Sequence, residues 1–215
     1  CWMFTSSIAS FIKLTESRGK KVLQNSVFGP EDNIVISDRY AAYNYFAEGN
    51  RQICWAHLRR DFARFAHSEN KEVQRFGLYL GQIAGELFTL KKALLTKEIG
   101  ILVFMRRVRK LRKRTWNYLR AISVLPDAKK AVGMAGSIMK SEDMMWRFLY
   151  DPYNIPLTNN HAERQIRHYV VYRKNSYFTQ SERGNRFLER LISLYLTCKQ
   201  QNLNPFKELT KLATA

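Results

Sequence analysis

The hydrophobic pattern of this 215-residue chain changes period along its length. From about residue 70 to residue 150, apolar residues recur at helical spacing without strand signals, as at Val73, Phe76 and Leu80. Ahead of this region, short β-branched and aromatic runs alternate with helical patterns. The sequence therefore predicts an α/β protein that is interrupted by an all-α insertion.

The first part of the chain predicts strands and short helices. Two runs, Cys1–Thr5 and Ser10–Thr15, are typical of the strands of a β-hairpin, and residues 22–28 predict a helix. Residues 33–38 form a continuous apolar run, which is typical of a strand buried on both faces. Residues 51–56 predict a further short strand that runs into a helix.

Asp38 ends the apolar run and so lies at the carboxyl end of the predicted strand. In open α/β sheets, ligands gather outside the carboxyl ends of strands, where an aspartate can reach a metal ion or a substrate. The alternative is that Asp38 caps a following helix, Tyr40–Phe46. The residues alone leave both roles open.

Cys54 and His57 meet at the next strand–helix junction. They are candidates for a metal pair, but without a second pair such residues more often serve packing and supporting hydrogen bonds. The three cysteines, Cys1, Cys54 and Cys198, show no spacing typical of zinc sites or disulfide frameworks. This cysteine usage suits a reducing cytoplasm.

Glu163 stands in a polar turn that feeds a helix, Thr158–Arg167. If the helix starts near Asn160, then Glu163, Ile166 and Val170 lie at i, i+3 and i+7 and share a face that should point at a core. A glutamate on such a face needs a cation. The alternative is an acid in the first turn that the helix dipole favours.

The charge of the chain predicts a polyanionic partner. The 36 Lys and Arg against 18 Asp and Glu give a net charge of +18, which favours nucleic acid first and anionic membrane second. The longest apolar candidate, Ile99–Met105, is too short to span a bilayer, so no membrane segment is expected.

Positive charge is densest between Ile101 and Arg120, where no acid occurs. This stretch predicts a helix that contacts DNA phosphates, and an ordinary solvated face is the alternative. Its basic residues are Arg106, Arg107, Arg109, Lys110, Arg112, Lys113, Arg114 and Arg120. Residues 170–178 are also basic, with interleaved aromatics that suit nucleic acid or, equally, a core.

Four ordered motifs resemble the successive signatures of one family, the insertion sequence 66 family of bacterial transposases. These motifs are Ser37–Asn44, Cys54–Phe62, Asn159–Arg164 and Arg173–Phe178. The resemblance covers nearly the whole chain. It implies a DDE transposase with an RNase H-like core, that is, a mixed sheet with flanking helices.

The resemblance also implies roles for individual residues. Asp38 would be the second acid of the catalytic triad and Glu163 the third, and together they would bind Mg²⁺ or Mn²⁺, with two ions in the complete site. The family's first Asp is expected on a strand before Cys1, so the 215-residue piece alone is predicted to be inactive. Supporting residues would be Cys54, His57, Asn160 and Arg164, and further phosphate contacts would come from Arg167, Arg173 and Lys174. Arg164 alternatively pairs with a core carboxylate.

The resemblance divides the chain into four parts. Residues 1–66 and 156–202 would form the catalytic core, residues 67–155 a basic helical insertion, and residues 203–215 a tail helix. The implied substrate is double-stranded DNA at element ends and target, bound by a homo-oligomer in the bacterial cytoplasm near the nucleoid. Two other functions stay open: a catalytically dead DNA-binding remnant or regulator of transposition, and a metal-independent recombinase with a tyrosine nucleophile.

Overall fold

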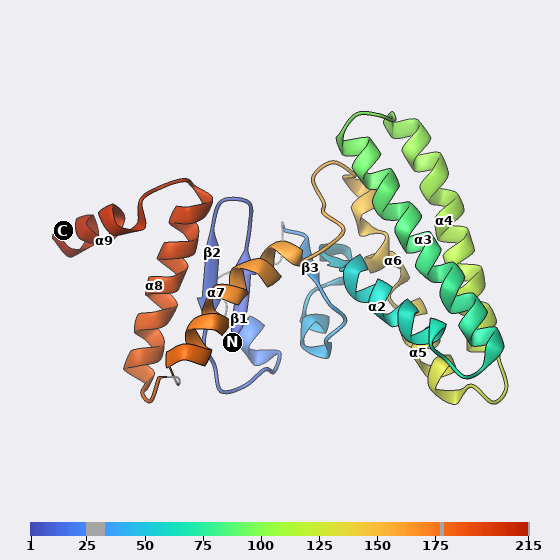
Figure 1. Cartoon of the computed structure of the whole chain (residues 1–215), viewed down its shortest axis with the longest axis horizontal. Coiled ribbons are helices and arrows are strands. Elements are labelled where there is room, and N and C mark those ends of the chain that lie inside the picture. The colour runs from blue at the N-terminus through green and yellow to red at the C-terminus, as the bar shows by residue number, and fades with distance from the viewer. Residues whose placement is uncertain (25–32, 177–178, 215) are drawn as a thin grey trace. The chain divides into compact units, whose positions relative to one another are not determined.

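The computed structural model describes residues 1–24, 33–176 and 179–214 (Figure 1). The chain forms two compact units, one from Cys1–Asn25 with Asn160–Ala215 and one from Ser26–Asn159. It is a mostly helical α/β protein with little sheet. Its described strands form two separate two-stranded sheets, one in each unit.

The first unit is built on the predicted hairpin, which is confirmed. Strands β1 (Trp2–Thr5) and β2 (Ser10–Lys13) pair antiparallel, with Trp2 opposite Lys13 and Thr5 opposite Ser10. Only the first turn of the predicted 22–28 helix is described, as α1 (Lys21–Gln24), and residues 25–28 lie outside the described residues. The other helices are α7 (Asn160–Ser176), α8 (Glu182–Gln200) and α9 (Pro205–Thr214).

Helix α8 covers the edge of β2 with side-chain acceptors. The backbone N–H groups of Ser10, Ile12 and Leu14 donate to Thr197 Oγ1 at 3.1 Å, Ser193 Oγ at 3.0 Å and Glu189 Oε1 at 2.6 Å. The acceptors are four residues apart on the helix, a rise of about 6 Å, and the donors are two residues apart on the strand, a rise of about 6.8 Å. The spacing of the acceptors therefore matches that of the donors. The edge is thereby blocked against further pairing.

The second unit begins with a parallel pair, β3 (Val35–Ser37) and β4 (Arg51–Ile53), in which Ser37 lies opposite Ile53. The prediction that this first strand is buried on both faces is wrong, because Val35 and Ile36 are only half-buried. β4 is its one partner among the described strands, so its other edge lacks the cover that a central strand has. The predicted helix after Asp38 is a 3₁₀ turn, Ala41–Tyr45, and a second one follows at Glu48–Asn50.

The predicted all-α character of residues 70–150 is confirmed. Helix α2 (Trp55–Ala66) precedes this region. The region itself contains the helices α3 (Lys71–Leu95), α4 (Ile101–Ser123), α5 (Lys129–Met139) and α6 (Glu142–Met145), and it ends in a 3₁₀ turn at Arg147–Tyr150. The long helices α3 and α4 run side by side in Figure 1. The predicted boundaries between core and insertion stay predictions about the family's architecture, because β3, β4 and α2 belong to the same unit as these helices.

The core of the second unit joins its strands to its helices. The Trp55 and Trp146 rings pack edge to face, with centroids 4.8 Å apart, and both side chains are buried. Gln52, on β4, is fully buried; its Nε2 donates to Met145 O at 3.0 Å and its Oε1 accepts from Phe148 N at 2.7 Å. These bonds satisfy a polar side chain inside an apolar core and fix β4 against α6.

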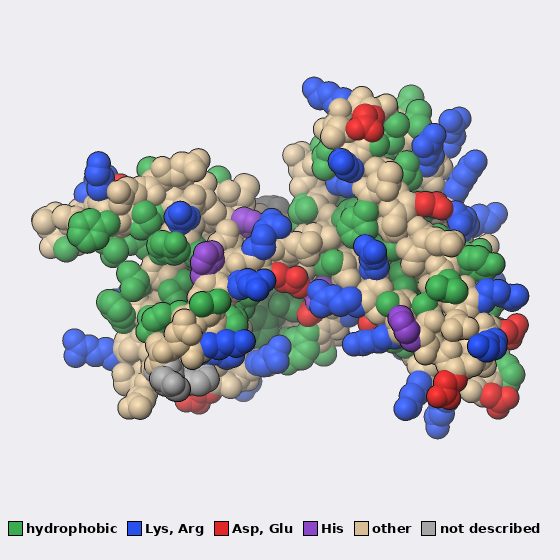
Figure 2. Space-filling view, in the orientation of Figure 1, with side chains coloured by type: hydrophobic (Ala, Val, Ile, Leu, Met, Phe, Trp, Pro, Cys, Tyr) green, Lys and Arg blue, Asp and Glu red, His purple; other side chains and the backbone are tan. Residues whose placement is uncertain are grey.

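Lys and Arg side chains are prominent on the surface in view (Figure 2). Among the described helices, none is long and apolar enough to cross a membrane.

Candidate active site

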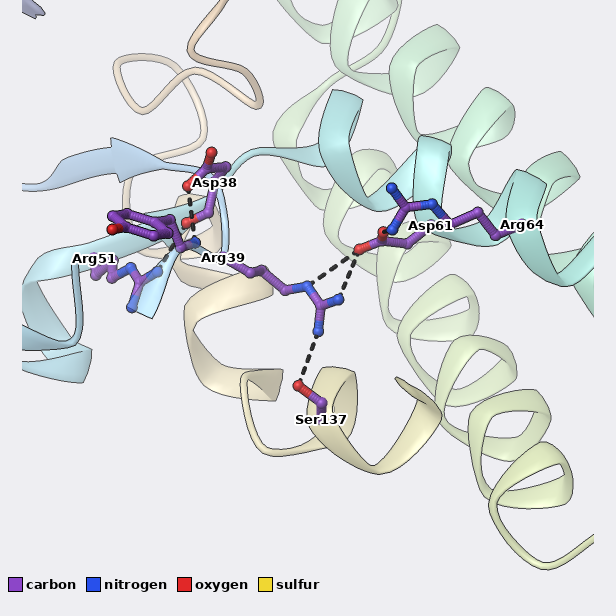
Figure 3. Close-up of polar contacts among 7 residues, drawn as sticks. Asp38, Arg39, Arg51, Asp61, Arg64 and Ser137 are labelled. Atoms are coloured by element: carbon purple, nitrogen blue, oxygen red, sulfur yellow. Dashed lines mark hydrogen bonds and ion pairs between the residues drawn. The ribbon is translucent and has the colours of Figure 1, made fainter. Parts of the chain in front are cut away.

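Asp38 follows β3 directly, as predicted, and its side chain is half-buried. Its Oδ1 accepts a hydrogen bond from Tyr40 N at 2.9 Å, at the start of the 3₁₀ turn (Figure 3). No donor from the described residues reaches Oδ2. One oxygen therefore shapes the turn, as in the capping alternative, while the other stays available to a ligand.

The Asp38 backbone is held from inside the unit by Arg51, whose side chain is 2% exposed. The Arg51 guanidinium donates to Asp38 O at 2.8 Å, to Ser37 Oγ at 3.0 Å and to Asn44 Oδ1 at 2.8 Å. Burial lowers the pKa of Arg51, and the nearby Asp38 and Tyr43 oppose that shift. Each of the three nitrogens of this buried guanidinium thus donates to a fixed acceptor, which holds the strand end in position.

Arg39 ties the same loop to two helices (Figure 3). Its Nη2 and Nε donate to Asp61 Oδ2 on α2 at 2.8 and 3.2 Å, and its Nη1 donates to Ser137 Oγ on α5 at 3.2 Å. Arg64 Nη1 meets the other Asp61 oxygen at 3.1 Å. Asp61 is thus committed to two arginines, whereas Asp38 has one oxygen that no donor from the described residues reaches.

Cys54 and His57 lie at the predicted strand–helix junction, Cys54 between β4 and α2 and His57 within α2. Cys54 is fully buried, and its N–H donates to Ser37 O at 2.8 Å, which joins the two strand ends. His57 is half-buried in the first turn of α2. Among residues 1–24, 33–176 and 179–214, no group of three or more His, Cys, Asp or Glu could hold a metal ion.

Glu163 lies in the first turn of α7, in the other unit. The prediction that it shares an inward face with Ile166 and Val170 is wrong, because Glu163 is exposed and the other two are only half-buried. The buried residue of α7 is Tyr169, which packs with Ile12 and Leu188. The helix therefore turns Tyr169 toward the hairpin and leaves Glu163 exposed.

The other predicted residues of α7 are mostly on its surface. Asn160, Arg164, Arg167 and Lys174 are exposed, and Arg173 is half-buried. Arg164 makes no ion pair with any carboxylate that the structure describes, so the alternative of a core partner has no support there. Tyr177 and Phe178, the last residues of the fourth motif, lie outside the described residues.

His161 anchors the start of α7, a role that the sequence reading missed. His161 Nε2 lies 2.6 Å from Gln200 Nε2 on α8. Gln200 also donates to Ser6 O at 3.0 Å and accepts from Ser10 Oγ at 2.9 Å. Because Gln200 is 39 residues away in sequence, local patterns could not reveal the pair.

Most of the chain matches a known protein family. A family model described as "Transposase IS66 family" matches residues 1–187. The chain belongs to the IS66 family of transposases. The resemblance carried by the four motifs is thereby confirmed, and it favours the DDE chemistry of this family over a tyrosine recombinase.

One relative of this IS66 transposase domain is an uncharacterized protein, y4qI, from Sinorhizobium fredii (strain NBRC 101917 / NGR234). The two are 26% identical over 197 residues, an alignment that covers 84% of this chain and 35% of that protein. The chain therefore spans about a third of the length of this relative. No solved structure matches the chain.

Proposed function

We propose that this chain supplies two metal ligands, Asp38 and Glu163, to the active site of a transposase that cuts and joins insertion-sequence DNA. The observation that carries the proposal is Asp38 at the carboxyl end of a parallel strand, with Oδ1 held by Tyr40 N–H and Oδ2 without a donor among the described residues. The family adds the expectation of an RNase H-like core and of divalent metal ions.

The residues around Asp38 suit a magnesium ligand. Carboxylate oxygens are the ligands that Mg²⁺ prefers, and the buried Cys54 offers no competing soft ligand at the surface. When bound, two divalent ions supply activation of the attacking oxygen and stabilisation of the leaving 3′-oxygen. Arg51 and Tyr40 N–H hold Asp38 in place beforehand, so the carboxylate need not reorganise.

The second ligand comes from the first turn of α7. Glu163 is exposed, so it carries no burial cost before an ion binds. The cations that follow it on α7, Arg164, Arg167, Arg173 and Lys174, are suited to holding the phosphates next to the scissile bond. Because joining requires two DNA ends, the reaction also calls for at least a dimer.

The test is cleavage of a duplex that carries the end of the insertion sequence, with protein made from the element's own gene. Asp38→Asn and Glu163→Gln are expected to reduce cleavage in Mg²⁺ to background while leaving DNA binding within about twofold, since only the metal site changes. Glu69→Gln, which removes an exposed carboxylate from a loop, is the matched control and should cleave normally. Cleavage by both site variants at the control rate refutes the assignment.

A regulator that binds DNA without cutting it is the second candidate. It is favoured by the basic helix α4, whose action needs no carboxylate. In that case the unaltered protein from the intact gene would shield element ends but never nick them, in Mg²⁺ or Mn²⁺.

A further inference from the structure

The eight cations of α4 are not equivalent. Arg112 pairs with Glu142 at 2.9 Å and Asp143 at 3.2 Å, and Arg114 pairs with Glu86 at 3.2 Å. These two arginines brace α4 against α6 and α3. The remaining six are exposed and pair with no acid among the described residues: Arg106, Arg107, Arg109, Lys110, Lys113 and Arg120.

Five of these six cations fall on one side of the helix. With 100° per residue, the spacing of Arg106, Arg109, Lys110, Lys113 and Arg120 confines them to an arc of about 100°. The buried residues Phe104, Val108, Leu111, Thr115, Leu119 and Ile122 centre on the opposite side. We call this row of five cations the basic stripe of α4, and from Arg106 to Arg120 it is about 21 Å long.

The basic stripe carries no aromatic side chain. Trp116 is half-buried and lines a cavity with Met139 of α5 and Met145 of α6, and Tyr118 packs on Tyr79 of α3, with ring centroids 5.2 Å apart. Proteins that grip single strands stack bases on exposed aromatics, which this surface lacks. A straight cationic row on a rigid helix matches the phosphates of a duplex instead.

A membrane is a poor partner for this surface. Helices that lie in a bilayer interface bury an apolar face in lipid. The apolar face of α4 is already buried against the helices of its own unit, and Leu102, 82% exposed, is the large apolar residue that it leaves open. Figure 2 shows blue side chains along the outer side of α4.

We infer that the basic stripe of α4 is a docking surface for double-stranded DNA that reads the phosphate backbone and not the base sequence. The inference rests on the proposed function and deepens it, because it names a surface of this chain, on α4, that holds the DNA substrate. It does not depend on metal or on cleavage.

The experiment measures binding of the chain to a random-sequence 30-base-pair duplex across a salt series, without divalent metal. The variant Arg106→Gln/Lys110→Gln/Lys113→Gln removes three stripe cations and keeps good helix formers. Each phosphate contact contributes about 0.9 to the slope of log affinity against log salt, so the slope should fall by about 2.7. At 0.15 M salt the same relation gives a loss of affinity of roughly 100-fold.

The matched control, Lys71→Gln/Lys92→Gln/Lys140→Gln, removes the same charge from exposed positions outside α4. It should change the slope by less than about 1, and Lys110→Arg/Lys113→Arg should retain the slope of the unaltered chain. Circular dichroism and thermal melting establish that all variants fold.

If the triple variant of the basic stripe and the triple control variant lose equal affinity for the duplex, the inference is overturned, since net charge alone would then explain both losses. Tighter binding to single-stranded RNA or to phosphatidylserine vesicles than to the duplex overturns the choice of partner. Asp38→Asn separates the two proposals. If metal-dependent cleavage is never found but the slope result holds, the docking surface stands while the proposed function falls.

Discussion

The ion pair between Arg39 and Asp61 should be the strongest electrostatic link between the Asp38 loop and the helices of its unit. The Asp61 side chain is 12% exposed and that of Arg39 is 20% exposed, whereas Arg64, the other partner, is 72% exposed. The perturbations are Asp61→Asn and Arg39→Met, which keep side-chain volume but remove one charge each.

The expected loss of stability follows from the burial and the geometry of the Arg39–Asp61 pair. Breaking a buried pair by removing one partner costs about 3–5 kcal/mol, and the partial exposure of Arg39 points to the lower end, about 3 kcal/mol. Two hydrogen bonds at 2.8 and 3.2 Å reach one carboxylate oxygen, so the coupling energy in a double-mutant cycle should be about 2 kcal/mol. For the exposed pair of Arg64 with Asp61, the coupling should stay below about 0.5 kcal/mol.

The assay is urea unfolding followed by tryptophan fluorescence in a Trp2→Phe background. Of the four tryptophans, the remaining three, Trp55, Trp116 and Trp146, lie in the second unit, so the signal reports on that unit. Each cycle needs its two single variants, their double variant and the parent, and in the comparison cycle Arg64→Met takes the place of Arg39→Met. Equal couplings for Arg39 and Arg64, or a coupling near zero for Arg39, would contradict the account of this loop.

Three further perturbations test separate contacts with the same kind of unfolding measurement. Gly77→Ala should destabilise the second unit by about 1–3 kcal/mol, because its Cβ would press on the backbone of Ala66, and an equal or higher midpoint would be the contrary result. Burial lowers the pKa of Lys91 from 10.5 to about 8. Between pH 8 and pH 10.5, Lys91 is therefore protonated in the unfolded state and deprotonated in the folded state, so the free energy of unfolding should rise with pH. Lys91→Met should lack that rise. Ser193→Ala, made in a chain that keeps Trp2, leaves the N–H of fully buried Ile12 without its acceptor. It should destabilise the first unit by about 1–3 kcal/mol, measured from the part of the fluorescence change that Trp2 contributes, and an unchanged midpoint would contradict the role of α8 as edge cover.

The elements predicted correctly are those fixed by local pattern. The hairpin, the strand that ends at Asp38 and the helical region from 70 to 150 each follow from the period of a few consecutive residues. Most cations of α4 also remain exposed in the folded chain, because its cations and its apolar residues lie on different faces of the helix. In these parts, neighbours in sequence carry most of the information.

The errors and omissions concern contacts between distant residues. Glu163 is exposed because the helix α7 packs its Tyr169 face, and not its Glu163 face, against Ile12. The apolar residues at i+3 and i+7 from Glu163 could not show which of these two faces of the helix is buried. The buried polar residues Arg51 and Gln52 look like ordinary surface types; for Gln52, the partner Met145 is 93 residues away. No periodicity in the sequence signals such a pair.

Whether Asp38 is a metal ligand can be decided by exchanging its carboxylate for a thiolate. The measurement is cleavage of the insertion-sequence end by Asp38→Cys, in Mg²⁺ and then in Mn²⁺, which accepts softer ligands more readily. If Asp38 is a ligand, Asp38→Cys should not cleave in Mg²⁺ and should recover part of its cleavage in Mn²⁺, whereas Asp38→Asn should be inactive in both. Full cleavage by Asp38→Cys and Asp38→Asn in Mg²⁺ would contradict it.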